Sequence, residues 1–347
     1  MSSQELRMQD VRKKARERVK ARCRVCPVCD GVACAGEVPG MGGIGTGRSF
    51  QNNVAALAQQ RLLMRVLHGA NEPDTGMELW GRRLALPVLA APVGSVAVNL
   101  GSDMRDADYA TFLIRGCRAA GTLGSVGDGL DAATFETNIS MIGDGGTSVI
   151  AFVKPWAAKE EISTRLDMAV KAGISICGMD VDAAGLTVLR RRGTPVSTQT
   201  PEELARVIKL AHARGIKFIV KGVMAVDEAV IAADAGADAV LVSNHGGRVL
   251  DHSPGTAEVL PAIADAVGGR VIVMMDGGVR TGVDVLKALA LGAKLALICR
   301  PVVVAVHGDE QNGVVKYFAQ IREELAQAMR LTGCANLSAI SRRVLMA

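Results

Sequence analysis

Residues 216–248 read IKFIVKGVMAVDEAVIAADAGADAVLVSNHGGR. An apolar strand over 216–221 leads through a glycine-containing loop into an amphipathic helix, and a second apolar strand follows over 238–242. The helix ends at Gly236, and glycine tolerates the left-handed conformation in which many helices terminate. The stretch is therefore a strand–helix–strand unit whose two strands lie parallel.

The same unit recurs from about residue 84 onward. The predicted strands are 87–91, 121–125, 148–153, 175–181, 216–221, 238–242, 270–275 and 294–299. Eight strands alternating with helices predict an α/β protein with a closed (β/α)8 TIM barrel. An open doubly wound sheet is the alternative, but its dinucleotide-binding form needs G-x-G-x-x-G after the first strand, and no such motif follows Ala91.

The length indicates how the chain is divided. A barrel of this type takes about 250 residues, and the chain has 347. We therefore expect a basic helix and a Cys-rich cap segment over residues 1–83 and the barrel over residues 84–347. Aromatic residues are only 3% of the chain, so the core should consist of aliphatic side chains in buried parallel strands.

The positive charge is concentrated at the N-terminus. Residues 1–25 hold nine Lys or Arg and three acids, whereas the whole chain has a net charge of +5. The barrel is thus close to neutral, and no nucleic-acid binding is expected of it. The basic arm consists of Arg12, Lys13, Lys14, Arg16, Arg18, Lys20 and Arg22. It is interpreted as a solvated helix face near its own acids, with an acidic partner or RNA as the alternative.

Two absences in the sequence bear on location. The N-terminus lacks the apolar segment of a secretory signal, and no run of about 18 apolar residues could span a bilayer. A cytoplasmic protein is therefore expected.

The loop after the sixth strand carries an imidazole and a guanidinium close together. In a barrel the loops that follow the strands carry function. His245 is a candidate general base near neutral pH, and Arg248 is a candidate clamp for a carboxylate. In the alternative interpretation, both side chains cap a helix or pair with surface acids.

The loops after the seventh and eighth strands resemble each other in their chemistry. Gly277, Gly278 and Arg280 follow one strand and Arg300 follows the other. Free backbone amides, a helix N-terminus and two arginines predict an anion site, with a pair of ordinary turns as the alternative.

Three further charges lie at strand ends. Lys221 closes the fifth strand, Asp180 lies near the end of the fourth, and Asp182 follows it. An extended backbone would direct both carboxylates to one side, into the barrel mouth. A lysine buried there needs an anion beside it; ion pairs at the barrel rim are the alternative.

The segments SNHGGRVLD (243–251) and DGGVR (276–280) resemble the FMN-dependent L-2-hydroxy acid oxidase and dehydrogenase family, which includes lactate oxidase and glycolate oxidase. The segments 74–81 and 91–94 resemble the same family, and the resemblance covers about residues 72–347 in outline. It implies oxidation of a small, lactate-like or glycolate-like L-2-hydroxy acid to the 2-oxo acid, by hydride transfer or through a carbanion. Oxygen, a protein or a quinone would accept the electrons, and a homotetramer is implied.

The resemblance also assigns roles to residues. His245 would be the base, Asp182 its orienting carboxylate, and Arg248 the clamp of the substrate carboxylate, while Lys221 would lie beside the flavin N1–O2 edge. The residues that it implies for FMN binding are Pro92, Val93, Gly94, Ser125, Asp180, Lys221, Ser243, Asp276, Gly277, Gly278, Arg280, Cys299 and Arg300.

Some positions depart from the family pattern. The family's Gln-x-Tyr after the third strand is replaced by 150–152 (IAF), and Lys154 or Trp156 is a substitute for binding substrate. Asp180 replaces a flavin-contacting Thr, and Cys299 stands where Gly is common. The identity of the hydroxy acid therefore stays open.

Four cysteines are crowded ahead of the barrel. Cys23, Cys26, Cys29 and Cys34 have the spacing C-x2-C-x2-C-x4-C, which is compatible with zinc or an iron–sulfur cluster. The alternative is a set of reduced thiols in a small cap over the active site.

Two other functions compete with hydroxy acid oxidation. A type 2 isopentenyl diphosphate isomerase shares the flavin barrel and a similar phosphate segment but does not need SNHGGR. A non-catalytic flavin sensor would need the phosphate site but no base. His245 with Arg248 in one loop favours the oxidising enzyme.

Overall fold

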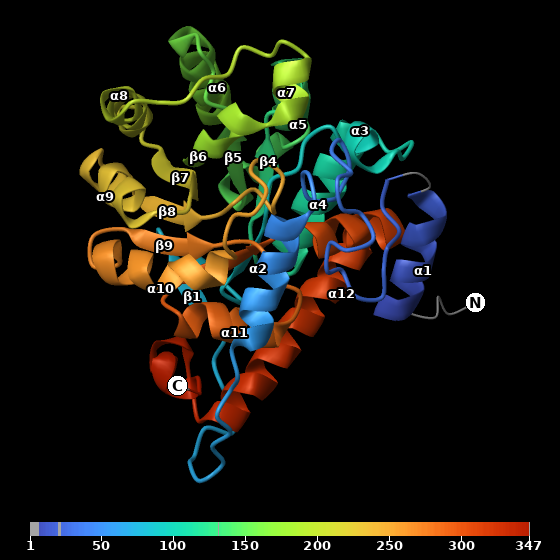
Figure 1. The fold of residues 1–347 in the computed structure, drawn as a ribbon, viewed down its shortest axis with the longest axis vertical. Helices are drawn as coiled ribbons and strands as arrows, with labels where there is room; N and C mark the ends of the chain where they lie inside the picture. The colour runs from blue at the N-terminus through green and yellow to red at the C-terminus, as the bar shows by residue number, and fades with distance from the viewer. Residues whose placement is uncertain (1–6, 20–21, 131, 347) are drawn as a thin grey trace.

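The computed structural model of the protein describes residues 7–19, 22–130 and 132–346. At its centre is a closed barrel of eight parallel strands in chain order, which closes where the last strand pairs with the first (Figure 1). The strands are β3 (Val88–Ala90), β4 (Gly124–Gly127), β5 (Val149–Val153), β6 (Ile176–Asp180), β7 (Lys217–Val223), β8 (Ala239–Val242), β9 (Ile272–Met275) and β10 (Leu295–Ile298). The predicted TIM barrel is confirmed.

Helices follow the strands and surround the barrel. They are α3 (Val96–Leu100), α4 (Asp106–Ala119), α5 (Ala132–Ser140), α6 (Lys159–Lys171), α7 (Thr187–Arg191), α8 (Pro201–His212), α9 (Val226–Asp234), α10 (Thr256–Val267), α11 (Gly282–Ala290) and α12 (Arg300–Thr332). Gly236, expected to end a helix, has a positive φ, and so do Gly121, Gly173 and Gly292, which follow other helices. Gly121 forms the turn that ends the preceding helix. Strand β4 therefore begins three residues later than the predicted strand 121–125.

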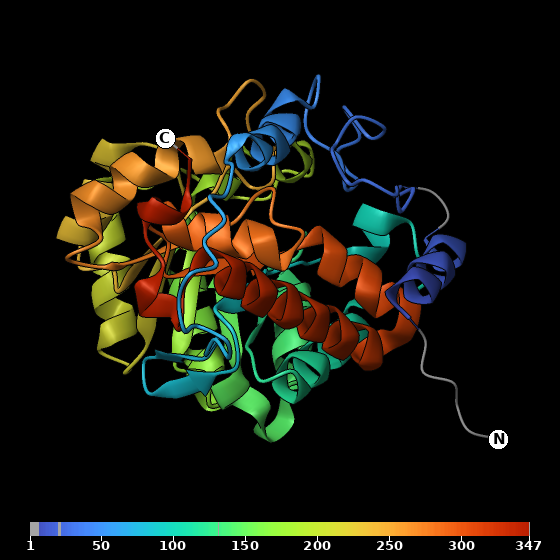
Figure 2. The ribbon, with the colours of Figure 1, turned by 90° about the horizontal axis from the view of Figure 1, so that it is seen from below.

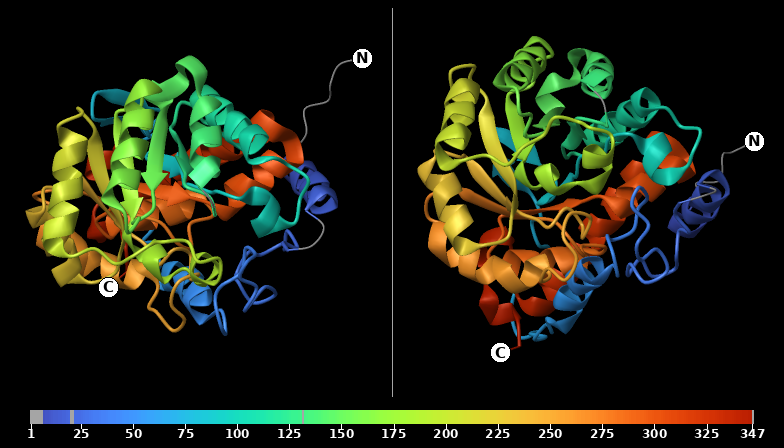
Figure 3. Two further views of the ribbon diagram at one scale, coloured as in Figure 1. Left: turned by 90° about the horizontal axis from the view of Figure 1, so that it is seen from above. Right: turned by 45° about the horizontal axis from the view of Figure 1, so that its top comes forward.

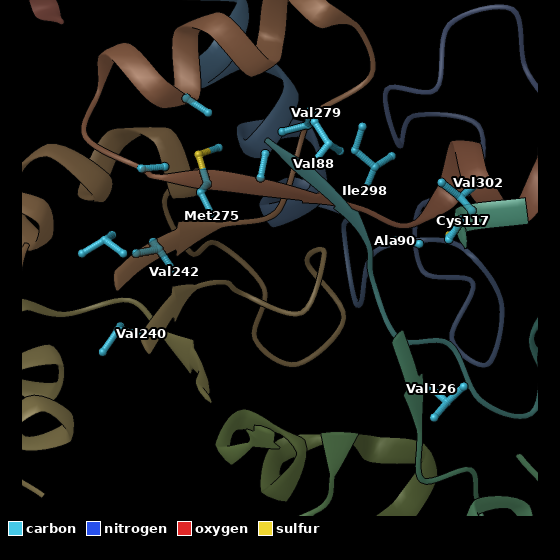
Figure 4. Packing of buried hydrophobic residues seen from close by; sticks show 14 of the residues in the cluster. Val88, Ala90, Cys117, Val126, Val240, Val242, Met275, Val279, Ile298 and Val302 are labelled. Carbon is cyan, nitrogen blue, oxygen red and sulfur yellow. The ribbon is translucent and has the colours of Figure 1, made fainter. Parts of the chain in front are cut away.

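The strands alternate between two buried layers, as the period of two in a strand requires. One set of residues fills the barrel interior, with Leu89, Phe152, Ile219, Leu241 and Met274 among its members. The other set packs outward against the helices; Figure 4 shows part of this layer. The interior is therefore a packed apolar core below the site.

A hairpin that the sequence analysis did not predict packs into the same interior core. Strands β1 (Met77–Leu79) and β2 (Arg82–Leu84) pair antiparallel. Leu79 and Leu84 are buried with the interior residues of the barrel strands. The hairpin thus precedes β3 and completes the core from which the first barrel strand starts.

The N-terminal segment contains two helices, α1 (Met8–Arg18) and α2 (Arg48–Gln59). Helix α1 packs against α12 at the edge of the molecule (Figures 1 and 2). Gly308 of α12 permits the close approach, because a Cβ there would lie 2.1 Å from the carbonyl oxygen of Val11. Helix α2 packs against α10 and α11.

The basic arm turns toward the chain's own backbone. Arg16 Nη2 donates to the carbonyl oxygen of Val25 at 2.8 Å, and Arg12 Nη2 donates to that of Pro27 at 3.1 Å. Arg18 lies 3.7 Å from Glu310. Lys20, assigned above to this arm, lies outside the described residues. At least three of these arginines therefore make contacts within the protein, joining α1 to the segment that follows it or to α12.

Within the described residues, no helix combines the length and the apolar character needed to cross a membrane.

Candidate active site

A cavity opens at the carboxyl ends of the barrel strands. The predicted site residues that line it are Pro92, Val93, Gly94, Lys154, Asp180, Lys221, His245, Arg248, Asp276, Cys299 and Arg300. Most of them occupy the inward-facing position that follows the apolar interior layer on each strand, or the loop directly after it. The structure therefore brings together, at one end of the barrel, side chains that are scattered over 200 residues of sequence.

His245 and Asp182 form a hydrogen-bonded pair. The Nδ1 atom of His245 lies 3.0 Å from Asp182 Oδ1. His245 has a φ of +56°, and its backbone N–H donates to Ser243 Oγ at 3.1 Å. Since Asp182 engages Nδ1, Nε2 is the ring nitrogen left to accept a proton from a molecule in the cavity.

Asp182 reaches this position by a route that differs from the predicted one. Strand β6 ends at Asp180, and a 3-10 turn, η2 (Val181–Gly185), carries Asp182. The extended-backbone argument was therefore wrong for Asp182, although both carboxylates do lie near His245. Gly222 provides the space: it has a φ of +103°, and a Cβ there would be 2.5 Å from Asp182 Cγ.

The same glycine interrupts a β-ladder. The pairing of β7 with β8 shifts register between Lys221 and Val223. A glycine within a strand signals such a bulge or a close approach. Gly222 was thus a detectable functional position that the sequence analysis missed.

Lys221 is the central cation of the site. Its Nζ lies 3.0 Å from Asp180 Oδ1 and 3.8 Å from Asp276 Oδ2, and the residue is only 4% exposed. Burial alone would lower the pKa of Lys221, but the carboxylates of Asp180, Asp182 and Asp276 outweigh it and raise the pKa. The lysine therefore stays charged and holds three carboxylates in a small volume.

The carboxylates respond differently to this environment. Burial would raise the pKa of Asp182, yet the charges of His245 and Lys221 lower it overall. For Asp276 burial prevails, and the pKa is raised despite Lys221. Asp182 is thus the better-defined anion, as an orienting partner of an imidazole must be.

The ligand-type oxygens and nitrogen of Asp180, Asp182 and His245 lie within 4.8 Å of one another. Among the described residues, this is the one such trio. Lys221 supplies the positive charge that a metal would otherwise provide, since its Nζ lies 3.0 Å from Asp180 Oδ1.

Arg248 is half-buried, and it is oriented by a helix that the sequence analysis did not connect to the site. Its Nη2 donates to Asn99 Oδ1 at 2.8 Å, and Asn99 Nδ2 donates to the carbonyl oxygen of Gly94 at 2.9 Å. Burial lowers the pKa of Arg248 to about 10, with the charge of Arg300 adding to the effect. The guanidinium remains charged at neutral pH and is suited to a carboxylate.

The two predicted anion-site arginines share one aromatic ring. The Cζ atom of Arg300 lies 3.7 Å from the ring centre of Phe50, and that of Arg280 lies 5.7 Å from it. Arg300 also donates to the carbonyl oxygens of Met41 and Gly246, at 2.8 and 2.9 Å. Phe50 was not predicted, because nothing local in the sequence shows that α2 lies over these loops.

Gly277 and Gly278 make close contact with α2 through Asn53. Cβ atoms at these positions would lie 3.0 Å from Asn53 Oδ1 and 2.2 Å from its carbonyl oxygen, respectively. Asn53 also exchanges two hydrogen bonds with Asn244, at 2.8 and 3.0 Å. The glycine pair is therefore required for packing as well as for any anion site.

The third strand contributes an apolar wall and one charge. Ile150 and Phe152 are fully buried in the interior, and Gly178 faces Phe152, where a Cβ would meet its ring at 2.5 Å. Lys154 lines the cavity and donates from Nζ to the carbonyl oxygens of Asp128 and Gly129. Trp156 instead donates from Nε1 to Asp128 Oδ2 at 2.9 Å. It does not line the cavity, so it is not placed to bind substrate.

Several buried polar atoms around the barrel mouth fit a bound cofactor. Within residues 7–19, 22–130 and 132–346, Ser125 Oγ, Asp182 Oδ2, Arg248 Nε and Asp276 Oδ1 have no hydrogen-bond partner. Nearly all buried polar groups in folded proteins are paired. Unpaired atoms concentrated around one cavity match a polar ring system and chain such as those of a flavin nucleotide.

The four N-terminal cysteines are free thiols of intermediate burial. No three of them have sulfur atoms within 4.8 Å of one another among the described residues. The structure therefore does not contain a preformed metal site there.

Known proteins relate the chain to one family. The FMN-dependent dehydrogenase family matches residues 40–208 and 194–347. The chain belongs to the FMN-dependent dehydrogenase family. This membership makes it an FMN-dependent oxidoreductase, as the resemblance implied.

Individual relatives of this flavoenzyme match nearly their whole length. The chain is 32% identical over 327 residues to 4-hydroxymandelate oxidase of Amycolatopsis orientalis, covering 87% of this chain and 90% of the relative. It is 30% identical over 334 residues to 2-hydroxyacid oxidase 1 of Homo sapiens, covering 85% and 87%. The structure of a mandelate oxidase variant with 2-hydroxy-phenylacetamide aligns with a TM-score of 0.77 at 29% identity, covering 99% of this chain and 98% of that one.

Proposed function

We propose that the protein oxidises a small L-2-hydroxy acid to the 2-oxo acid with FMN as the electron acceptor. One observation carries the proposal: His245, oriented by Asp182 through Nδ1 at 3.0 Å, lines the same cavity as Arg248. A base and a carboxylate clamp in one loop suit a substrate with a hydroxyl group next to a carboxylate. The relatives named as oxidases of 2-hydroxy acids and hydroxymandelate support the same substrate class.

The roles of the chain's residues follow from their positions. Arg248 binds the substrate carboxylate, held in place by Asn99. His245 Nε2 removes the proton that the substrate loses, and the Asp182 carboxylate stabilises the imidazolium that results. FMN, when bound, accepts the two electrons.

Other residues bind the cofactor. Arg280 and Arg300 hold the phosphate, with the turn at Gly277 and Gly278 opening α11 beside them. Lys221 stabilises negative charge on the flavin. The residues that contact the ring and the ribityl chain are Pro92, Val93, Gly94, Ser125, Asp180, Ser243, Asp276 and Cys299.

Lys154 and Phe152 differ from the family pattern at positions that concern substrate binding. Phe152 is buried in the barrel interior where the family often has a phenol, and Lys154 adds a buried cation to the cavity. Loss of the phenol removes a hydrogen bond to substrate, and we propose that Lys154 replaces it.

The second half of the reaction and the setting of the enzyme belong to the same proposal. The final electron acceptor would be oxygen, or a protein or a quinone. The homotetramer follows the family resemblance, and the cytoplasmic location is the one expected in the sequence analysis. Oxygen uptake, size-exclusion chromatography with light scattering, and cell fractionation test these three points.

The decisive experiment is reduction of the bound flavin. Protein purified with FMN is mixed without air with lactate, glycolate and mandelate in turn, and the visible flavin absorption is followed. We expect one of the acids to bleach it, and His245→Ala to slow the bleaching by about 100-fold to 10,000-fold.

His252→Ala is the matched control, because His252 lies seven residues on and its side chain is 71% exposed. It should leave the bleaching rate unchanged. Bound FMN that no 2-hydroxy acid reduces would contradict the proposal and favour the isomerase or the sensor, and equal rates for His245→Ala and the wild type would remove His245 from its role.

A further inference from the structure

The segment between α1 and α2, residues 22–47, has almost no apolar core of its own. We call it the cysteine cap. It contains no helix or strand, and its buried apolar side chains are those of Val25 and Met41. Val28 and Val32 are instead 66% and 62% exposed. Small segments with so little core usually depend on disulfides or a metal for a defined structure.

Disulfides do not stabilise the structure of the cysteine cap, because all four of its cysteines are free thiols. Cys23, Cys26, Cys29 and Cys34 lie within twelve residues of sequence. Pro27 bends the chain between Cys26 and Cys29. Gly31, which has a φ of +85°, bends it after Cys29. Such spacing recurs where thiolates from one short segment surround a metal.

All four cysteines line one cavity. It has a volume of about 610 Å³ and lies between the cysteine cap, α1 and the N-terminal end of α12. Figure 3 shows the cap as the loop between the two blue helices, beside the start of α12. The thiols are thus directed to a shared space instead of being dispersed through the core, as Cys117 and Cys177 are.

The walls of this cavity carry a strong excess of positive charge. The arginines that line it are Arg7, Arg12, Arg22, Arg24, Arg280 and Arg300, and among the described residues the one acid that lines it is Asp30. Arg280 Nη2 lies 3.8 Å from Cys29 Sγ. A divalent zinc ion with four thiolates has a net charge of about −2, and thiolate-bound iron–sulfur clusters are also anionic. Arg24 is paired with Glu37 at 2.6 Å, and Arg280 and Arg300 are assigned above to the phosphate, so the other arginines would compensate such a centre.

Backbone contacts hold the cap around this space. Arg16 binds the carbonyl oxygen of Val25, Arg12 that of Pro27, and Arg280 that of Cys29, the last at 3.2 Å. These bonds engage carbonyl groups between and at the cysteines, and the Cys23 thiol has a further backbone hydrogen bond with Val25.

We infer that Cys23, Cys26, Cys29 and Cys34 bind a metal centre as thiolates, either a zinc ion or an iron–sulfur cluster. Binding is ligation without a change of oxidation state in the protein: each of the four thiols loses its proton and forms one bond to a metal ion. Zinc–sulfur bonds of about 2.3 Å place the sulfurs about 4 Å apart, whereas in this structure no three of the four sulfurs lie within 4.8 Å of one another. Zinc binding would therefore draw the cap together, as is common where a site forms only with its metal.

The test uses the full chain, purified without air and without chelators. Zinc and iron are measured by mass spectrometry, acid-labile sulfide by colorimetry, and protein by amino-acid analysis. We expect either stoichiometric zinc, or iron with an equal amount of sulfide and a dithionite-sensitive absorption. The two results distinguish the two kinds of centre, and both support the site.

A double variant, Cys26→Ser with Cys29→Ser, should lose the metal. Cys334→Ser is the matched control, because Cys334 is a buried free thiol outside the cap, and it should retain the metal. The inference is overturned if the wild-type chain stays metal-free after incubation with zinc and with iron plus sulfide, or if the double variant keeps its metal.

Alkylation of the native chain covers the case in which the double variant does not fold. Adding a chelator should make the four cap thiols newly reactive, and no increase in alkylation would also overturn the inference. Metal content is measured without turnover, so the result is independent of the proposed oxidation of hydroxy acids.

Discussion

Replacing Gly222 with alanine should reduce turnover strongly without removing any chemical group from the site. An added Cβ would lie 2.5 Å from Cγ and 2.7 Å from Cβ of Asp182, whereas ordinary contacts are 3.4–4 Å. The Asp182 side chain is short and is fixed by His245, so it must move by about 1 Å, and displacements of that size cost about 100-fold in rate. The positive φ of +103° adds a loss of about 1–3 kcal/mol in the free energy of unfolding.

The assay is the anaerobic rate of flavin reduction by whichever acid reduces the wild type fastest, together with urea denaturation. Gly215→Ala is the matched control: Gly215 also has a positive φ, +72°, but a Cβ there meets nothing within 4 Å. This control should lose stability and keep its rate. If Gly222→Ala reduces the flavin within about twofold of the Gly215→Ala rate, the position of Asp182 does not govern catalysis and the reasoning is refuted.

Three further changes test other parts of the site. Arg248→Lys keeps the charge but loses the planar fork, so KM for the hydroxy acid should rise about 10-fold to 100-fold in steady-state assays; an unchanged KM would remove Arg248 as the clamp. Lys221→Met leaves buried carboxylates without their cation and should lower the free energy of unfolding in urea by about 3–5 kcal/mol, whereas a neutral effect would contradict the ion cluster. Hydrogen bonds from Thr46 help, against the effect of burial, to lower the pKa of Asp251 to about 2. Because this folded-state pKa lies below the ordinary value of about 3.9, the stabilisation is present above about pH 4 and is lost as the pH falls toward 2. The stability difference between the wild type and Asp251→Asn should therefore shrink over that range in thermal unfolding curves.

The barrel could be predicted because its signals are local. Each strand is an apolar run bounded by glycine-containing turns, and the conformations of Gly121, Gly173, Gly236 and Gly292 agree with that interpretation. The hairpin of β1 and β2 was not predicted, because strands of three residues are too short to show a period of two.

The site was predictable where residues lie at strand ends and unpredictable where distant segments meet. Lys221 follows from its place near the end of an apolar strand, and His245 and Arg248 follow from their places in the loop after one. Asn99 and Phe50 act through contacts with residues 149 and 250 positions away in sequence, and no local pattern encodes such contacts. Asp182 is an intermediate case. It was predicted as a site carboxylate, but neither its place on η2 nor the bulge at Gly222 that makes room for it was predicted.

Closure of the barrel between β10 and β3 has a consequence for how the chain is made. About 280 residues separate the end of α1 from the start of α12, which corresponds to roughly 15–60 s of synthesis at common translation rates. Until β10 leaves the ribosome, the edge of β3 has no neighbour on that side, and α1 has no helix to pack against. Nascent chains therefore expose an open strand edge and an unpartnered helix during most of translation. Products that terminate before residue 295 should aggregate or depend on chaperones.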